Sequence, residues 1–164
     1  MKNLNKADFY FGAFYSYLIT KAFKPVLIDQ ADSSRQLSVC TNAKEYNLFA
    51  MYISKPTNSS ADSLKTRWDF SFTGNLFESL IQSECSEKEN YVVFICGQEN
   101  LKDSEIIVVP YKKVLMCLGK DNVNKNRRVS ITVSKHENYA YCYGTAVSSQ
   151  NKFQIKRNIE EYLK

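Results

Sequence analysis

The sequence predicts one mixed α/β (α+β) domain over residues 1–164, with a mixed, largely antiparallel central sheet of six to eight strands covered by about four helices. Residues 91–96 form an unbroken run of six apolar residues that ends at Gly97. Such a short run, rich in β-branched and aromatic side chains, is typical of a strand buried on both faces, so we place it at the centre of the sheet. Around it, strand-like and helix-like apolar spacings are separated by turn residues. No internal repeat or compositional boundary divides the 164 residues.

The first predicted element is a helix over residues 7–22, capped by Asn5 or Asn3. Its apolar side chains occupy most of its circumference, which indicates a deeply packed helix or one that is partly an interface. Gly12 within it suggests close approach to another element, because glycine costs about 1 kcal/mol relative to alanine in a helix.

Three further helices are predicted downstream. The best delimited begins with Pro110 at its first position, carries apolar residues at Tyr111, Val114, Leu115 and Leu118, and is closed by Gly119. A second follows a cap at Thr73 or Asn75 and includes residues 76–81. The tail, residues 151–163, is expected to form the fourth helix, with Ile155, Ile159 and Tyr162 facing inward.

The remaining segments favour strands. Three short ones separated by tight turns indicate an antiparallel meander, a fourth alternates bulky and polar residues with period two, and the last two form a hairpin. A loop rich in small polar residues, 55–66, precedes the alternating strand. The predicted strands besides 91–96 are residues 26–28, 37–40, 48–54, 67–72, 105–109, 128–134 and 139–143.

The charge is concentrated at one end of the chain. Residues 1–119 carry equal numbers of basic and acidic residues, whereas residues 120–164 carry nine Lys and Arg against four Asp and Glu. A basic segment on a neutral body suits an anionic partner, with nucleic acid first. A solvated surface that aids solubility explains the same excess.

Cysteine usage and the N-terminus bear on the compartment. The five cysteines have no CxxC spacing, and two of them lie within apolar runs, as expected of buried thiols in a reducing compartment. The first residues lack the apolar segment of a signal peptide, and no apolar stretch is long enough to span a membrane. We therefore expect a cytoplasmic protein.

Familiar catalytic signatures are absent. The sequence has no Gly-rich phosphate loop, no GxSxG motif and no EF-hand spacing. His136 is the only histidine, which excludes HExxH and any site with several His ligands. A Cys–His pair between Cys142 and His136 across the predicted hairpin is one hypothesis. A solvated histidine at a hairpin tip is the simpler interpretation.

The order of elements over residues 7–96, helix, three strands, helix and strand, resembles the αβββαβ core of the PD-(D/E)XK nuclease superfamily. The resemblance implies acidic residues and a lysine that hold Mg²⁺ at a phosphodiester, with Lys55 at the position of the lysine. Asp29, Asp32 and Glu45 are nearby acids, but none stands at motif spacing. The residue two before Lys55 is Ile53 rather than Asp or Glu. Without a second carboxylate Mg²⁺ lacks anionic oxygens, so the motif is degenerate and this copy of the fold is expected to be inactive or rebuilt.

Two polar groups are candidate binding sites. Glu99, Asp103 and Glu105 follow the central strand, where loops leaving a sheet often bind ligands, although a solvated loop explains them too. The second group combines cations with tyrosines that alternate on one predicted strand and therefore share a face. Stacking tyrosines beside cations is how single-stranded nucleic acid is held, although the same tyrosines could pack under a helix as core. This group is Lys125, Arg127, Arg128, Lys135, Tyr139, Tyr141 and Tyr143.

The sequence thus favours a nucleic-acid-associated protein that binds through its basic C-terminal region, with a degenerate nuclease-like scaffold as one interpretation of its fold. The alternative is a non-catalytic protein-interaction factor, inhibitory or accessory, from a bacterium or mobile element, acting through an aromatic surface. An enzyme with an unfamiliar site near Asp29, Asp32 and Lys55 is the third hypothesis. No metal site or cofactor is expected, except Mg²⁺ if the protein is nuclease-like.

Overall fold

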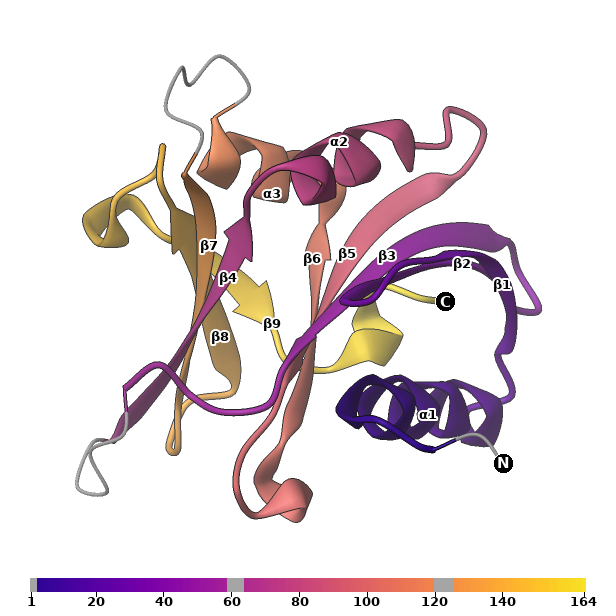
Figure 1. The fold of residues 1–164 in the computed structure, drawn as a ribbon, viewed down its shortest axis with the longest axis horizontal. Coiled ribbons are helices and arrows are strands. Elements are labelled where there is room, and N and C mark those ends of the chain that lie inside the picture. The colour runs from indigo at the N-terminus through magenta and orange to yellow at the C-terminus, as the bar shows by residue number, and fades with distance from the viewer. Residues whose placement is uncertain (1–2, 59–63, 120–125) are drawn as a thin grey trace.

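Two β-sheets form the frame of the protein (Figure 1). The computed structural model describes residues 3–58, 64–119 and 126–164. Sheet A has the strand order β1-β2-β3-β5-β6, and sheet B has the order β4-β7-β8-β9. The strands of sheet A are β1 (Lys24–Gln30), β2 (Ser34–Cys40), β3 (Glu45–Ile53), β5 (Glu89–Cys96) and β6 (Glu105–Pro110). Those of sheet B are β4 (Lys65–Phe72), β7 (Arg127–Ser134), β8 (Tyr139–Gly144) and β9 (Phe153–Lys156).

Sheet A is antiparallel except at one place. The meander β1-β2-β3 and the pair β5-β6 are antiparallel, whereas β3 and β5 run parallel, with Phe49 opposite Val92. Sheet B is antiparallel throughout. Strand β4 lies between β3 and β5 in the sequence but pairs with β7. The chain therefore leaves sheet A, starts sheet B and returns.

Strand β5 is buried on both faces, as the apolar run predicted. On one face Phe94 meets sheet B, with its ring 4.6 Å from that of Phe70. On the other face Val93 and Ile95 pack in a second core that includes Phe14 of α1. Sheet A therefore separates two hydrophobic cores, one shared with sheet B and one shared with α1.

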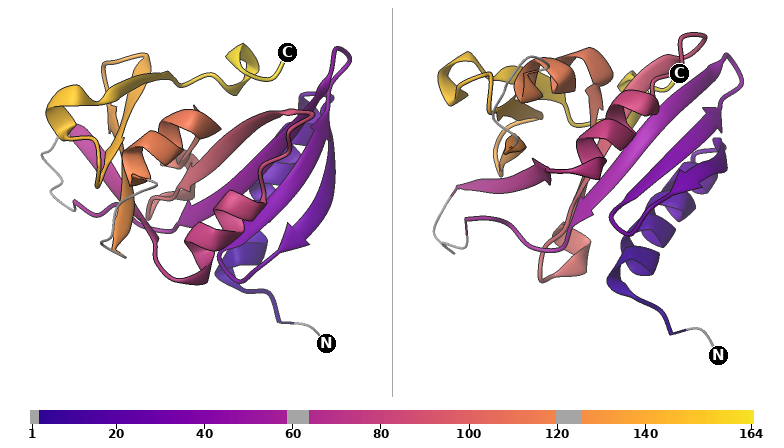
Figure 2. Two further views of the ribbon diagram at one scale, coloured as in Figure 1. Left: turned by 90° about the horizontal axis from the view of Figure 1, so that it is seen from above. Right: turned by 45° about the horizontal axis from the view of Figure 1, so that its top comes forward.

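Three α-helices occur in the described residues, and they lie at two levels. Helix α1 (Lys6–Thr20) covers the face of sheet A away from sheet B, and a capping box between Asn5 and Asp8 starts it. Helices α2 (Asn75–Gln82) and α3 (Tyr111–Leu118) close one end of the space between the sheets (Figure 2). Within the described ranges no helix is long and apolar enough to cross a membrane.

A buried tyrosine joins the two short helices. The hydroxyl of Tyr111 donates a hydrogen bond of 2.9 Å to the carbonyl of Leu80. Burial raises the pKa of Tyr111 to about 12, and the charge of Glu84 adds to the effect. Helix α3 ends at Gly119, whose φ of +73° is a conformation that glycine adopts without strain.

The α+β class and the mixed, largely antiparallel sheet A are as predicted, but two parts of the fold prediction are wrong. The strands form two sheets of five and four, rather than one sheet of six to eight, and the described residues contain three α-helices rather than four. The expected tail helix, 151–163, is instead β9 followed by a short 3₁₀-helix at Ile159–Glu161. Residues 152–156 alternate polar and apolar, and Ile155 pairs with Ala140 at the free edge of β8. That pairing prevails over the helical spacing of Ile155, Ile159 and Tyr162.

Candidate nucleic-acid interface

The outer face of sheet B, away from the shared core, carries the three predicted tyrosines. Along β8, Ala140 and Cys142 are buried in the core, so Tyr139, Tyr141 and Tyr143 point the other way. Tyr139 is 41% exposed, and the other two are half-buried. The tyrosines therefore lie on the surface and do not belong to the core.

The strand register shows which residues share this face, because residues opposite each other in a sheet point the same way. Tyr141 lies opposite Thr132 of β7 and Gln154 of β9, and Thr132 lies opposite Arg67 of β4. We call the set the tyrosine face. It comprises Lys65, Arg67, Asp69 and Ser71 of β4, Arg128, Ser130 and Thr132 of β7, Tyr139, Tyr141 and Tyr143 of β8, Lys152 before β9, and Gln154 and Lys156 of β9.

Cations surround the tyrosines on this face. The ammonium of Lys152 lies 4.2 Å from the centre of the Tyr141 ring, and Arg128 is exposed. Asp69 is the one acidic member of the set, and it is engaged by Arg67 at 3.4 Å and by the hydroxyl of Ser130 at 2.6 Å. Two further acids contact this face, since Glu161 pairs with Lys156 and Glu137 accepts a hydrogen bond from Tyr141. Five cations against three acids leave the face net positive as well as aromatic.

Tyr141 stays neutral over the whole physiological range. Its hydrogen bond to Glu137 is the main cause that raises the pKa of the phenol, with smaller contributions from burial and from the carboxylate charge. The phenol therefore carries no negative charge of its own, although the carboxylate of Glu137 accepts its hydrogen bond and Lys152 lies over its ring.

The two neighbouring arginines of the predicted group are separated by the strand. Arg128 belongs to the tyrosine face, whereas the guanidinium of Arg127 lies 3.9 Å from the centre of the Phe77 ring of α2. Arg127 is opposite the buried Phe72, which places it on the core side of sheet B. Lys125 lies outside the described residues. Lys135 follows β7 and lines a cleft between the sheets rather than the tyrosine face.

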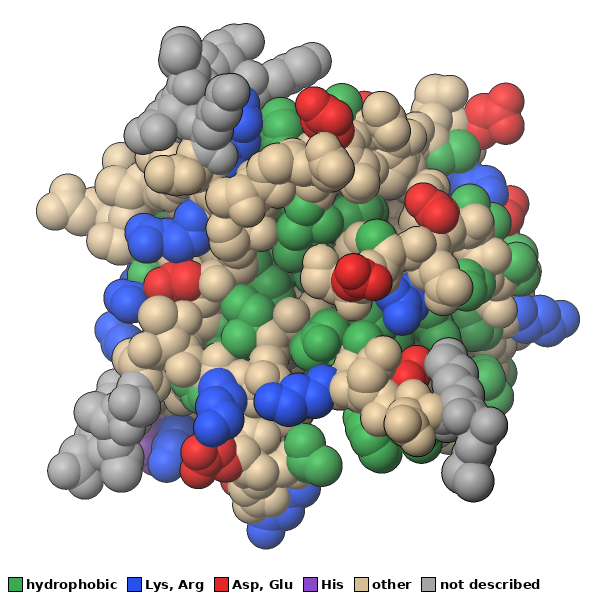
Figure 3. All heavy atoms as spheres, in the orientation of Figure 1, with side chains coloured by type: hydrophobic (Ala, Val, Ile, Leu, Met, Phe, Trp, Pro, Cys, Tyr) green, Lys and Arg blue, Asp and Glu red, His purple; other side chains and the backbone are tan. Residues whose placement is uncertain are grey.

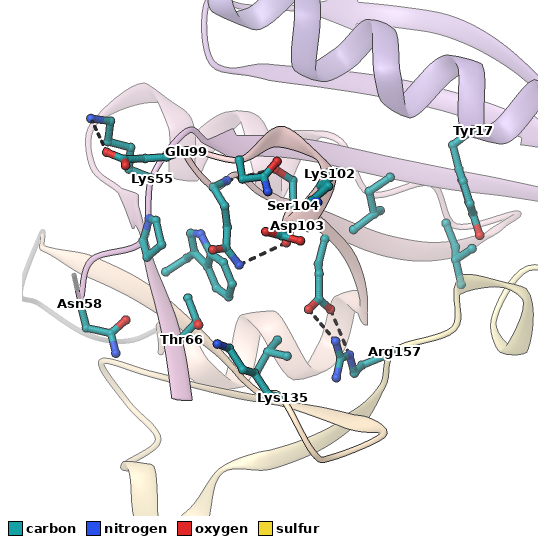
Figure 4. Close-up of a pocket in the computed structure, with 18 residues that line it drawn as sticks. Tyr17, Lys55, Asn58, Thr66, Glu99, Lys102, Asp103, Ser104, Lys135 and Arg157 are labelled. Carbon is teal, nitrogen blue, oxygen red and sulfur yellow. Dashed lines mark hydrogen bonds and ion pairs between the residues drawn. The ribbon is translucent and has the colours of Figure 1, made fainter. Parts of the chain in front are cut away.

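This cleft, of about 1180 Å³, opens between the sheets at the end opposite α2 and α3 (Figure 4). At its wall, the indole N–H of Trp68 donates a 2.8 Å hydrogen bond to the carbonyl of Gly97. A Cβ on Gly97 would lie 2.6 Å from the carbonyl oxygen of Ile53, so no larger residue fits there. Figure 3 shows apolar side chains in the hollow between the sheets and Lys and Arg side chains along its lower edge.

An ion pair joins the two sheets across the cleft. The guanidinium of Arg157 donates to both carboxylate oxygens of Glu105, at 2.6 and 3.0 Å, and both side chains are about three-quarters buried. The same guanidinium donates to the carbonyls of Ser134 and Glu137, at 3.2 and 2.6 Å. Arg157 thus ties β6 of sheet A to the β7–β8 turn of sheet B.

The predicted acidic group lines this cleft, since Glu99, Asp103 and Glu105 all contribute to its wall. Glu105 is neutralised by Arg157, and Glu99 lies 3.5 Å from Lys55 in a pair whose side chains are both mostly exposed. Across the described part of the chain, no three His, Cys, Asp or Glu side chains are grouped so that they could hold a metal ion.

The three candidates from the nuclease resemblance do not line one cavity. Lys55 lines the large cleft, Asp29 lines a separate cavity of about 230 Å³, and Asp32 is exposed in the β1–β2 turn. The order α1, β1, β2, β3, α2, β5 does occur, with β4 inserted before α2. Neither Asp29 nor Asp32 therefore lines the cleft of Lys55, and neither replaces the acid that the motif lacks.

The Cys142–His136 hypothesis is wrong. The thiol of Cys142 is buried in the shared core, 3.7 Å from the sulfur of Cys117, and this neighbour and burial both raise the pKa of Cys142. His136 is exposed in the β7–β8 turn. A fully buried thiol and an exposed turn histidine do not form a catalytic pair.

Sequence reasoning did not place Lys152 and Lys156 with the tyrosines, because it expected the tail to be a helix, and it missed Lys65. The missed signal is the alternation of Lys152, Gln154 and Lys156 with two apolar residues. Treated as a strand beside β8, it would have placed both lysines with the tyrosines.

Comparison with protein-family models, with curated proteins and with solved structures found no match to this chain.

Proposed function

We propose that the protein binds single-stranded nucleic acid across the tyrosine face. The observation that carries the proposal is the row of three tyrosines on the outer face of sheet B, with Arg67, Arg128, Lys152 and Lys156 around it. Aromatic rings stack on bases of any sequence, and the cations contact the backbone phosphates.

The spacing of the tyrosines favours a single strand. Residues two apart in a strand are separated by about 6.8 Å, twice the rise of about 3.4 Å per nucleotide in a stacked strand. Neighbouring tyrosines therefore suit bases that have been drawn apart, as they are in an extended single strand. A duplex hides its base faces, and a broad sheet face offers no helix or ribbon that would enter a major groove.

The test is fluorescence anisotropy with labelled oligothymidylate, oligouridylate and a mixed-sequence duplex. With about four phosphate contacts, log K should fall with log salt at a slope of about −3, which weakens binding roughly 50-fold between about 50 and 200 mM salt. Both single strands should bind more tightly than the duplex. Absence of binding to any of the three at the lowest salt would overturn the proposal.

Two neighbouring arginines provide a matched pair of variants. Arg128→Ala removes a phosphate contact, so it should weaken binding and reduce the salt slope by about 0.7. Arg127→Ala removes the same charge from the core side of the sheet and should leave the slope unchanged. Equal effects of the two variants would place the nucleic acid elsewhere.

A further inference from the structure

Strand β1 is an edge strand whose apolar side chains are exposed. Within the described part of the chain it pairs with β2 alone, and every residue of Lys24–Gln30 except Pro25 is exposed. The consecutive residues Val26, Leu27 and Ile28 are 54, 47 and 56% exposed. Successive side chains of a strand point to opposite faces of the sheet. Apolar surface is therefore exposed on both faces of β1 as well as along its edge.

This geometry determines the kind of partner. A helix or a flat surface laid on one face of sheet A would leave the apolar side chains of the other face in water. A strand added alongside β1 contacts side chains on both faces and pairs the free backbone groups of the edge. The surface therefore suits another β-strand.

We propose that this strand is β1 of a second copy of the chain, paired antiparallel, so that two copies of sheet A join into one continuous sheet. A two-fold axis through an antiparallel pair places one residue opposite itself. With Leu27 at that position, Val26 of each copy lies opposite Ile28 of the other, and the centre of the contact is apolar.

The charges at the ends of β1 favour this arrangement. Lys24 begins the strand and Asp29 lies near its end, with Asp32 following in the turn. In the antiparallel register, Lys24 of one copy lies opposite Gln30 of the other, one residue from Asp29. The bulge between Leu27 and Asp29 puts Asp29 on the same face as Lys24, so the two charges lie close together. Parallel pairing would put Lys24 beside Lys24, and like charges opposite each other in a sheet are destabilising.

Two features limit the contact and set its strength. Pro25 lacks an N–H, and the register of β1 shifts between Leu27 and Asp29, a bulge that leaves Ile28 without a partner in β2. The paired segment is therefore short.

On the same side of the molecule α1 packs against β1 and exposes Phe9 and Ile19, each 62%. A short interface of this kind belongs to the weak class, with a dissociation constant on the order of micromolar.

Helix α1 has open space around Gly12. A Cβ on Gly12 would meet nothing within 4 Å among the described residues, contrary to the close approach that the sequence suggested. A two-fold axis perpendicular to the sheet keeps both α1 helices on one face of the joined sheet.

Sedimentation equilibrium of the protein without nucleic acid tests the proposal, so its outcome is independent of the tyrosine face. The mass should rise from that of the 18.9 kDa chain towards twice that value as concentration increases. Leu27→Lys should remain monomeric, because it places two ammonium groups at the two-fold axis. Leu101→Lys is the control, because Leu101 is 68% exposed and far from β1 in the sequence and in the sheet order. It should behave as wild type.

Charge reversal then tests the direction of pairing. Lys24→Asp and Asp29→Lys should each weaken association several-fold, and the double variant should restore it, since opposite charges meet again. A protein that stays monomeric at all concentrations would overturn the proposal. So would a dimer that Leu27→Lys leaves intact, or a double variant that shows no recovery.

Discussion

Sheet A and sheet B differ in how many faces they bury, and the difference is written in their central strands. β5 of sheet A is a continuous apolar run with a core on each side, whereas β8 of sheet B alternates a small buried residue with a tyrosine that faces outward. The free energy of unfolding should therefore depend mainly on sheet A, whereas the outer face of sheet B is the one on which we propose binding. Substitutions in the two strands should separate these roles.

The largest effect is expected at Phe94 in β5. Its ring packs against Phe70 and Phe72 of sheet B, so Phe94→Ala removes contacts that hold the sheets together. We expect a loss of about 3–5 kcal/mol in the free energy of unfolding, measured by urea denaturation. Tyr143→Ala in β8 should cost less than about 1 kcal/mol, because the ring is half-exposed. Similar losses for both would remove the distinction between the sheets.

Arg157 tests the connection between the sheets. Arg157→Ala leaves Glu105 without its partner and two carbonyls without a donor, so unfolding should become easier by about 2 kcal/mol. The neighbouring Lys156 is the control. Its pair with Glu161 is about half-exposed, and Lys156→Ala should cost less than about 1 kcal/mol. An unchanged denaturation midpoint for Arg157→Ala would show that the contacts of Arg157 do not contribute to stability.

Substitutions of Tyr141 test the proposed binding on sheet B. Tyr141→Ala should weaken single-strand binding by about 1–3 kcal/mol, or roughly 5- to 150-fold, with little change in salt dependence. Tyr141→Phe keeps the ring and should bind within about twofold of wild type. Anisotropy titrations of both variants, with denaturation curves as a check on folding, measure this. Equal losses for Phe and Ala would assign the effect to the hydroxyl and not to stacking.

The smallest expected effect is a loss of stability at low pH. Lys88 donates a 2.8 Å hydrogen bond to Glu45, and together with the Ser38 hydroxyl it lowers the pKa of that carboxyl. Lys44 and then Tyr91 lower the pKa of Glu89 in the same way. A carboxyl with a lowered pKa in the folded state stabilises the fold above its ordinary pKa of 4.5, and the contribution disappears as pH falls through the lowered value.

The urea concentration at the denaturation midpoint should therefore decrease as the pH is lowered below about 4.5. Glu45→Gln with Glu89→Gln should flatten that part of the curve. Glu87→Gln should not, because Glu87 forms no ion pair in the described structure. A wild-type curve already flat in this range would exclude the two pairs as contributors.

Much of the local structure could be predicted from sequence, because it follows from periodicity. The run at 91–96, the meander, the hairpin of β7 and β8, and the helix between Pro110 and Gly119 all lie where the pattern placed them. The division into two sheets could not be predicted. The alternation at 67–72 shows that one face of β4 is buried but not which strand lies beside it, and β7 is more than fifty residues away.

The candidate site was predicted in part for the same reason. Alternation shows that Tyr139, Tyr141 and Tyr143 share a face, but only the placement of the helices determines that this face is open. The same alternation would have separated Arg127 from Arg128, had it been applied to them. The tail was ambiguous, since its apolar residues fit a helix as well as a strand, and the free edge of β8 decided between the two.

The insertion of β4 between β3 and β5 bears on how the chain folds during synthesis. All five strands of sheet A have been made once residue 110 leaves the ribosome, whereas β4 must wait for β7, which begins at Arg127. Until then β4 has no strand to pair with, and Trp68, Phe70 and Phe72, all fully buried in the finished protein, can pack only against sheet A. We expect nascent chains that end between these points to expose this strand and to recruit chaperones that bind aromatic segments.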